Sequence, residues 1–166
     1  MRGFTLIEMV VAIVLVGLLA SLGGLLMGKA FDAYTGARDI VTVAVPGQVA
    51  LEQMVREIRQ VRSQTVKDIP LWSPTVFEFY DTSGRFIRYY QAGSQLMQSA
   101  DGGVTGQPMA DGISNLSFIY TDKNGHVLVP TSGGEGNLWE VTIQFTAASG
   151  VLQRAYQVSV TPRMFQ

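Results

Sequence analysis

The sequence predicts an α+β protein in which one long N-terminal helix packs on an antiparallel β-sheet. Two observations support this fold class. No charged residue occurs from Met9 to Gly28, and apolar residues at helical spacing follow this run. From Val76 onward, apolar and polar residues alternate with a period of two, which is typical of half-buried strands. We therefore expect a helical region over residues 1–66 and a β-rich globular part over 67–166.

Composition limits the function classes. The chain has 166 residues, of which 47% are hydrophobic and 10% aromatic, enough for the core of one domain. Its 12 basic and 13 acidic residues leave a net charge of −1, which disfavours a dedicated nucleic-acid binder. The absence of cysteine excludes disulfides, a thiolate nucleophile and cysteine metal sites.

The uncharged run from Met9 to Gly28 predicts a transmembrane helix. At about 1.5 Å per residue, its 20 residues span roughly 30 Å, the thickness of a bilayer's hydrocarbon core. Arg2 and the amino terminus are expected to stay in the cytoplasm, which places the remaining chain on the other side of the membrane. A cleaved secretory signal is the competing explanation, but it favours a longer basic region and a shorter apolar one.

The helix is predicted to continue as an amphipathic segment over residues 29–66. Apolar residues that share one helical face occur at Leu51, Met54, Val55, Ile58 and Val61. Glu52 and Arg56 have the spacing of an ion pair on the outer side. Pro46-Gly47 predicts a kink or a break, because proline lacks a donor and clashes with the preceding turn.

Five alternating stretches predict the strands of the sheet. The expected strands and turns are Val76–Tyr80 and Phe86–Gln91 joined through Asp81–Gly84, Leu116–Tyr120 ended by Asn124-Gly125, and Trp139–Phe145 and Tyr156–Val160 joined through Thr146–Leu152. Two glycine-rich connections, Asp101–Gly112 and Pro130–Asn137, are expected to be mobile surface loops.

Few residues suggest catalytic or metal chemistry. His126 is the only histidine, and beside Asn124-Gly125 it is expected to flank a turn rather than bind a metal. The oxygens of Asp111, Asp122 and Asn124 are possible calcium ligands, but their spacing fits no calcium-loop pattern. No hydrolytic triad or phosphate loop is recognisable, so we expect neither an enzyme nor a cofactor.

Two further groups of residues have alternative interpretations. Arg56, Arg59 and Arg62 share a helical spacing that would suit DNA, but Glu52 and Glu57 lie among them, so a solvated face is favoured. Four aromatic residues would suit a ligand groove, but their strand spacing favours a place in the core; these are Phe77, Phe79, Tyr89 and Tyr90.

Glu8 is unusual because it stands at the start of the predicted membrane span. A carboxylate deep in a bilayer costs about 2.5 kcal/mol or more, so such residues usually pair with a cation or face another protein. No basic residue lies within one helical turn of Glu8. A solvated position at the headgroup interface is the alternative.

The segment Gly3-Phe4-Thr5-Leu6-Ile7-Glu8, followed by the uncharged run, resembles the processing signal of type IV prepilins and type II secretion pseudopilins. The resemblance implies a pilin-like fold, a leader at residues 1–3, cleavage after Gly3, N-methylation of Phe4 and a mature transmembrane helix over 4–28. It also implies that Glu8 pairs with the Phe4 amino group of a neighbouring subunit and so sets the register of assembly.

A weaker resemblance covers three later segments. Leu51–Gln60, Asp111–Phe118 and Val158–Pro162 are similar to minor pilins and pseudopilins of the J and W type, including those of mannose-sensitive haemagglutinin (MSHA) systems. The resemblance implies a minor subunit that helps to initiate or cap a filament, with other subunits, prepilin peptidase and an inner-membrane assembly platform as partners. It implies an inner-membrane protein whose C-terminal part is periplasmic.

Two other function classes stay open from the sequence. One is a signal-anchored periplasmic enzyme or ligand-binding module with a pocket between helix and sheet. The other is a tip subunit that binds DNA or a surface, for which the arginines of the amphipathic helix would be responsible. Retention of residues 1–3 would favour the first class, and salt-dependent DNA binding would favour the second.

Overall fold

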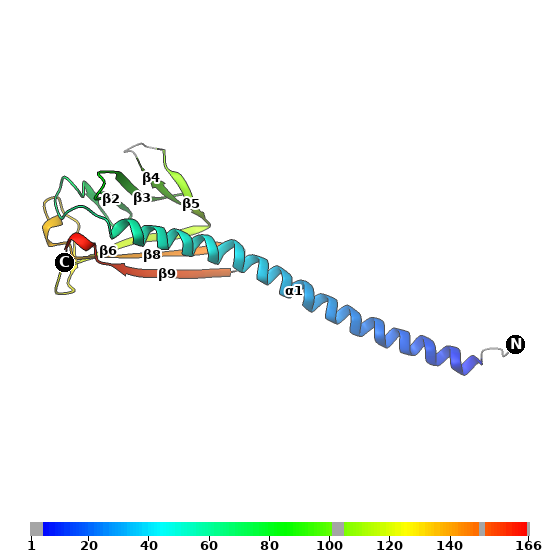
Figure 1. Cartoon of the computed structure of the whole chain (residues 1–166). Helices are drawn as coiled ribbons and strands as arrows, with labels where there is room; N and C mark the ends of the chain where they lie inside the picture. The colour runs from blue at the N-terminus through cyan, green and yellow to red at the C-terminus, as the bar shows by residue number, and fades with distance from the viewer. Residues whose placement is uncertain (1–4, 101–104, 150–151, 166) are drawn as a thin grey trace. The chain divides into compact units, whose positions relative to one another are not determined.

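A computed structural model of the chain describes residues 5–100, 105–149 and 152–165, with the backbone alone for 37–44. The chain divides into two compact units, residues 1–39 and 40–166, and each is described by itself. The elements in chain order are α1 (Leu6–Ile58), β1 (Leu71–Trp72), β2 (Val76–Tyr80), β3 (Phe86–Ala92), β4 (Gln95–Ser99), β5 (Gln107–Asp111), β6 (Ile113–Thr121), β7 (Val127–Leu128), the 3₁₀ turn η1 (Glu135–Asn137), β8 (Glu140–Ser149), β9 (Leu152–Val160) and the 3₁₀ turn η2 (Arg163–Phe165). The layout is therefore α+β (Figure 1).

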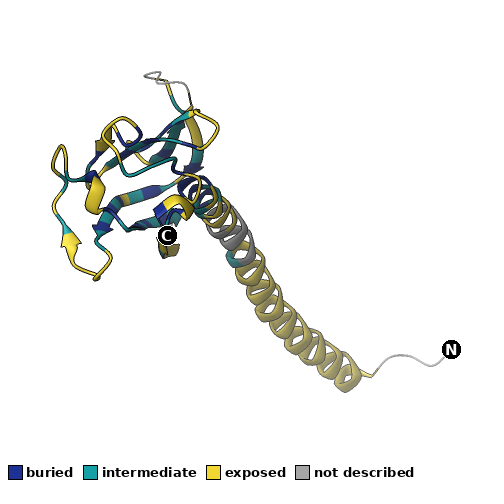
Figure 2. Cartoon of the chain, turned by 60° about the vertical axis from the view of Figure 1, so that its left-hand side comes forward, coloured by how far each residue is buried: buried dark blue, intermediate teal, exposed yellow. Residues whose placement is uncertain are grey.

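The first unit consists of the N-terminal part of α1, and its described side chains lie almost entirely in contact with solvent (Figure 2). The segment Leu6–Gly36 contains an 18-residue window with a mean hydropathy of 2.6, and by length and composition this segment is able to cross a membrane. Its polar side chains bond to the helix itself: the Ser21 hydroxyl donates to the Leu18 carbonyl at 2.8 Å, and the Thr35 hydroxyl to the Phe31 carbonyl at 3.0 Å. Such bonds reduce the cost of placing hydroxyls in an apolar environment.

Helix α1 runs through Pro46 without interruption, so the break considered from the sequence does not occur. The neighbouring Gly47 is buried, and a Cβ atom there would lie 3.1 Å from the ring of Tyr156 on β9. Gly47 therefore lets the helix approach the sheet closely. The same Tyr156 ring stacks on Phe145 at a centroid distance of 5.1 Å.

The end of α1 is amphipathic, as the sequence predicted. Met54, Ile58 and the following Val61 are fully buried, while Leu51 and Val55 are half-buried. Burial of such side chains, each worth about 1.5–3 kcal/mol relative to exposure, is what fixes this part of the helix on the globular core.

The strands form two antiparallel sheets rather than the single sheet expected from the alternation. One sheet has five strands in the order β1-β2-β3-β4-β5, and the other has four in the order β7-β6-β8-β9. Alternation reports which face of a strand is buried but does not say which strands pair, so the division was not visible in the sequence. The end of α1 shares one hydrophobic core with both sheets.

The predicted hairpins are confirmed. Strand β2 pairs with β3 in the register Phe77 to Tyr89, and β8 pairs with β9 in the register Phe145 to Tyr156. Strand β6 also forms as expected, and its turn at Gly125 has φ +83°, which favours glycine.

The two glycine-rich connections differ from the prediction in part. Residues 107–111 form β5, which pairs with β4, so this stretch is not a loop. In the second connection Glu135 is buried, and its carboxylate accepts bonds from the Trp72 indole at 3.0 Å and the Gly133 amide at 3.2 Å. A strand and a satisfied buried carboxylate thus replace parts of the expected mobile loops.

The chain passes from the first sheet to the second at Gly112, between β5 and β6. Its φ is +69°, and a Cβ atom would lie 2.1 Å from the carbonyl oxygen of Ala148 on β8. Only glycine fits this crossing, because a side chain would collide with backbone.

Candidate functional site

The first turn of α1 contains Glu8, which the sequence singled out for assembly. Thr5 precedes the helix, and its carbonyl accepts the first helical bond from Met9 at 3.3 Å. The Glu8 carboxylate accepts from the Thr5 amide and the Thr5 hydroxyl, each at 3.3 Å, and the Glu8 amide donates to the Thr5 hydroxyl at 3.4 Å. These reciprocal bonds form a capping box.

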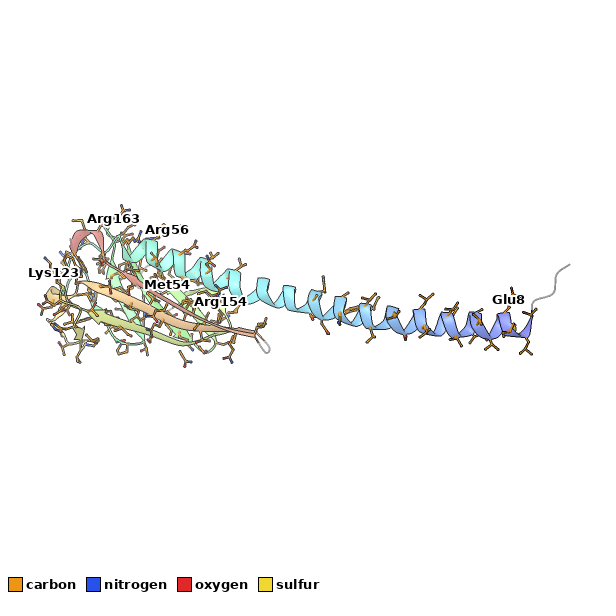
Figure 3. The ribbon with its side chains drawn as sticks, turned by 90° about the horizontal axis from the view of Figure 1, so that it is seen from below. Glu8, Met54, Arg56, Lys123, Arg154 and Arg163 are labelled. Atoms are coloured by element: carbon orange, nitrogen blue, oxygen red, sulfur yellow. The ribbon has the colours of Figure 1, made fainter. Side chains whose placement is uncertain are left out.

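The capping box is a role for Glu8 that the sequence interpretation missed. The signal was present as Thr5-Leu6-Ile7-Glu8, a threonine with glutamate three residues later at a helix start. Both side chains are exposed, as Figure 3 shows for Glu8 at the beginning of the ribbon. Glu8 therefore has a local partner within its own chain and still presents its carboxylate to a second partner. Gly3 and Phe4 lie outside the described residues.

The helix that follows Glu8 lacks a protein environment in the isolated chain. None of the 18 residues of its most apolar window is buried. Leu6 is 84% exposed and Leu19 70% exposed, which is unfavourable in water and expected for a segment whose solvent is lipid or other apolar helices. The N-terminal region thus combines a capped, acidic first turn with an apolar membrane span.

Comparison with known proteins supports the interpretation of the N-terminal segment as a prepilin-type processing signal. Residues 1–24 match the family model of the prokaryotic N-terminal methylation motif. Comparisons with curated proteins and with solved structures gave no match. The N-terminal segment is therefore a type IV pilin-like prepilin signal, and it supports a precursor that one apolar helix anchors in a membrane. The motif implies cleavage by prepilin peptidase, N-methylation and other pilin-like subunits as partners.

His126 and Asp122 form the turn between β6 and β7. Asp122 accepts bonds from the amides of Asn124 and His126, each at 2.8 Å, and its other oxygen lies 3.1 Å from His126 Nδ1. The bond from the His126 amide, aided by the His126 ring and the Asn124 amide, lowers the pKa of Asp122. Within the described residues, no three histidine or acidic side chains are arranged to hold a metal ion. The turn-flanking position expected for His126 is confirmed.

The three arginines of the amphipathic helix, Arg56, Arg59 and Arg62, do not form one continuous basic surface. Arg62 bonds to the buried Asp68, which also accepts from the Ser63 hydroxyl at 2.5 Å. Arg56 and Arg59 instead line a groove together with Arg163 from the C-terminal turn η2. The helical spacing had indicated Arg62 as the third arginine beside Arg56 and Arg59. Arg163 takes that place through the tertiary fold, and no local sequence pattern indicated it.

Glu57 is buried, although the sequence placed it on a solvated face. Its carboxylate accepts from the Tyr89 hydroxyl at 2.5 Å and from the Gln98 amide at 2.6 Å, and it lies 3.5 Å from Arg85. Burial and the Glu57 charge raise the pKa of Tyr89, so the phenol stays protonated and donates. These bonds join α1 to β3 and β4. The expected core position of Phe77, Phe79 and Tyr89 is confirmed, and Tyr90 is half-buried.

Proposed function

We propose that the chain is a minor pilin or minor pseudopilin, a structural subunit that helps to initiate or cap a type IV pilus or a type II secretion pseudopilus after processing by prepilin peptidase. Cleavage after Gly3 releases residues 1–3 and makes Phe4 the methylated N-terminus. The mature chain stays in the inner membrane through its apolar helix, with the β-rich part in the periplasm, until an assembly platform moves it into the filament.

One observation carries the proposal: a methylation motif at residues 1–24 overlaps the apolar helix segment Leu6–Gly36, and no residue of the most apolar window of this segment is buried in the single chain. A helix of this kind needs apolar neighbours on all sides. Lipid supplies them before assembly, and the helices of other subunits supply them within a filament. The minor role rests on the resemblance of the later segments to J- and W-type subunits.

The rival class, a signal-anchored enzyme or binding module, requires a functional pocket in the globular part. The groove between α1 and β9 is lined by aliphatic, arginine, glutamate and glutamine side chains. This lining suits binding of another chain better than hydrolytic or redox chemistry. We therefore propose a subunit without catalytic activity.

The first experiment determines the mature N-terminus. The full chain is expressed with and without a prepilin peptidase, and intact mass and N-terminal sequencing are measured. Loss of residues 1–3 and one added methyl group on Phe4 is the expected result, and only in the presence of the peptidase. A chain that keeps residues 1–3 in both cells would contradict the proposal.

A set of variants at the first turn separates the charge of Glu8 from its capping role. Glu8→Gln keeps a capping box, because glutamine is accepted at this position, but removes the charge. Thr5→Ala removes the cap and keeps the charge. We expect normal processing in both, and a loss of about tenfold or more in filament incorporation for Glu8→Gln and Glu8→Ala alone, since an unpaired Phe4 ammonium is costly in an apolar filament.

Equal incorporation of Glu8→Gln and the unchanged chain, measured by immunoblot of sheared filaments, would show that the Glu8 charge has no role in register. A loss confined to Thr5→Ala would show that the cap matters instead.

A further inference from the structure

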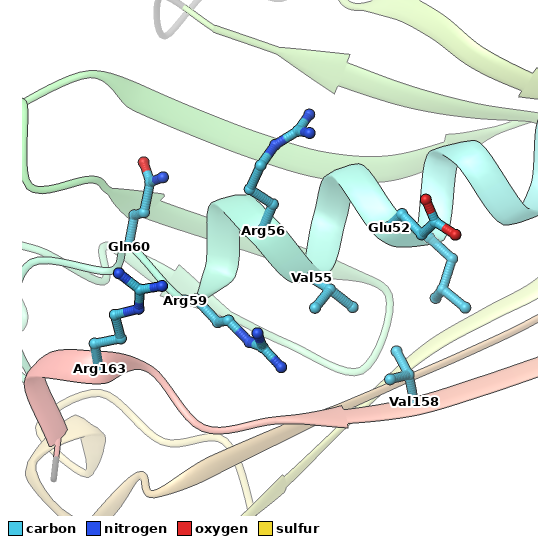
Figure 4. A pocket seen from close by; sticks show the side chains of 8 residues that line it. Glu52, Val55, Arg56, Arg59, Gln60, Val158 and Arg163 are labelled. Atoms are coloured by element: carbon cyan, nitrogen blue, oxygen red, sulfur yellow. The ribbon is translucent and has the colours of Figure 1, made fainter.

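An open groove runs between the last turns of α1 and the end of β9, with a volume of about 480 Å³ (Figure 4). Leu51, Val55 and Val158 form its apolar side, and all three are half-buried. In Figure 4, Val55 and Val158 face each other across the groove, Arg59 extends toward them, and Arg163 is drawn farther along the groove on the Gln60 side. The groove therefore offers an apolar surface next to positive charge.

Arg59 and Arg163 are held side by side by the backbone. The Arg163 amide donates to the Arg59 carbonyl at 3.1 Å, which ties the C-terminal turn to the end of the helix. Both side chains are exposed. Within the ranges that the structure describes, neither guanidinium has an ion-pair partner, whereas Arg62, Arg85 and Arg88 each have a carboxylate within 4 Å.

Two exposed arginine side chains that line one groove without a counter-charge in the described residues favour binding of an anion. Each presents a planar fork of donors that fits a carboxylate in a bidentate manner, and such bonds are stronger than neutral ones. The partial negative charge at the end of α1 attracts these arginines, but its contribution is small at an exposed surface. The Arg59 carbonyl is also already satisfied by the Arg163 amide.

The lining favours a protein segment over a nucleic acid as the occupant. Leu51, Val55 and Val158 match apolar side chains, which a phosphate backbone does not provide. Arg62, which would extend the basic row along the helix, is bonded to Asp68. Nucleic-acid binding without sequence preference also uses aromatic platforms, and the lining contains no aromatic side chain.

We propose that this groove docks an acidic, partly apolar segment of a neighbouring subunit. Its carboxylate lies between Arg59 and Arg163, and an adjacent apolar side chain packs on Val55 and Val158. That the partner is another subunit rests on the function proposed above. Binding of an acidic segment by the groove does not depend on the proposed function. The groove proposal and the proposed function can therefore fail separately.

Binding of an acidic peptide to the groove is tested on the full chain in detergent. Arginine side-chain NMR signals are followed while the peptide acetyl-Leu-Asp-Glu-Leu-amide is added, with the neutral acetyl-Leu-Asn-Gln-Leu-amide as its matched control. We expect the acidic peptide to shift the Arg59 and Arg163 signals and to leave Arg154 unchanged. Equal shifts with both peptides, or none at Arg59 and Arg163, would overturn the proposal. Shifts caused by a short oligothymidine but not by the acidic peptide would make nucleic acid the occupant and the proposal wrong.

The partner is tested by photo-crosslinking in cells that assemble the filament. A benzoylphenylalanine is placed at Gln60 on the groove rim, with Lys123 as the control position. We expect a cross-link from Gln60 alone to a subunit with a prepilin-type signal, at a peptide that contains Asp or Glu. A cross-linked peptide without an acidic residue would overturn the proposal.

Variants without the arginine charges test whether the cross-link depends on the groove. The double variant Arg59→Gln and Arg163→Gln is expected to lower cross-link yield by about tenfold or more, because it removes both charge-assisted contacts. Arg154→Gln is the control. An unchanged yield in the double variant would contradict the proposal, provided that urea unfolding shows a folded protein. Cleavage after Gly3 is measured in the same cells, so failure of the proposed function is detected independently.

Discussion

The two ends of α1 belong to one continuous helix but obtain their stability in different ways. The residues from Met9 to Gly28 carry no charge and lie exposed, while Met54, Ile58 and their neighbours bury one face in the globular core. The first part keeps its own hydroxyls bonded to helix carbonyls, whereas the second bonds to other elements through Gln53 and Glu57.

This difference shows that helical structure and tertiary contact are separate requirements in this chain. The N-terminal part needs only a local helix and an apolar environment, so its side chains are interchangeable within wide limits. The C-terminal part needs shape and hydrogen-bond complementarity to particular partners. Substitutions that are equivalent by chemistry should therefore differ in effect according to the tertiary contacts of the replaced side chain, and three pairs of variants and one single variant test this.

The largest difference is expected for truncation of apolar side chains. Met54→Ala should reduce the free energy of unfolding of the globular part by about 2–5 kcal/mol, because Met54 is fully buried and a cavity remains. Leu18→Ala should leave this free energy nearly unchanged. The measurement is urea unfolding of the full chain in detergent, followed by fluorescence of Trp72 and Trp139. Similar losses in both variants would contradict the comparison.

The next difference concerns carboxylates of the same helix. Glu57→Gln should destabilise the fold by about 1–3 kcal/mol, because its NH₂ group replaces the oxygen that accepts from Gln53 and faces Arg85, and because the bonds from Tyr89 and Gln98 lose their charge. Glu52→Gln is the matched control; Glu52 is exposed and bonds to Gln48 within the helix. The same unfolding assay decides, and a greater loss for Glu52→Gln would refute the structural role of Glu57.

A third pair compares glycines. Gly47→Val is expected to cost about 1–3 kcal/mol, because the new side chain meets the Tyr156 ring. Gly28→Val has open space around it and should not change unfolding of the globular part. A Tyr156→Ala background should relieve much of the Gly47→Val loss, which would identify the ring as the obstacle.

The smallest effect is expected for the dependence of stability on acidic pH. The hydrogen bonds from Arg62, and secondarily Ser63, lower the pKa of Asp68 below its usual value of about 3.9. Its contribution to stability is present above that usual value and is lost as the pH falls through the lowered pKa of the folded state. Asp68→Asn should therefore reduce the pH dependence of the urea midpoint below about pH 4. An unaltered profile would show that the Arg62 pair contributes nothing measurable, as exposed pairs often do.

Features that depend on local pattern were predictable from the sequence. These include the apolar N-terminal helix, the amphipathic end of α1 and the β2–β3 and β8–β9 hairpins. They were predictable because the spacing of apolar residues follows the helical or strand period. The capping bonds between Glu8 and Thr5 were also visible in the spacing of the two residues but were overlooked.

Features that depend on contacts between distant segments were not predictable. The burial of Glu57 requires Tyr89 and Gln98 to face it, and the position of Arg163 requires η2 to return to the end of α1. Likewise, Pro46-Gly47 predicted a kink or a break from proline chemistry, and the packing role of Gly47 was missed because the Tyr156 ring is more than a hundred residues away in the chain. Composition alone also suggested loops where β5 and the buried Glu135 occur.

The order of strands in the two sheets has a consequence for how the protein forms. In the first sheet, strand order equals chain order, so each strand pairs with the one synthesised just before it. In the second, β8 pairs with β6 and then β9 pairs with β8, again close in sequence. Contacts of this kind close short loops and form early. The bond from Arg163 to Arg59 needs the last residues of the chain, so the groove at the end of α1 is complete only when the whole globular part has folded.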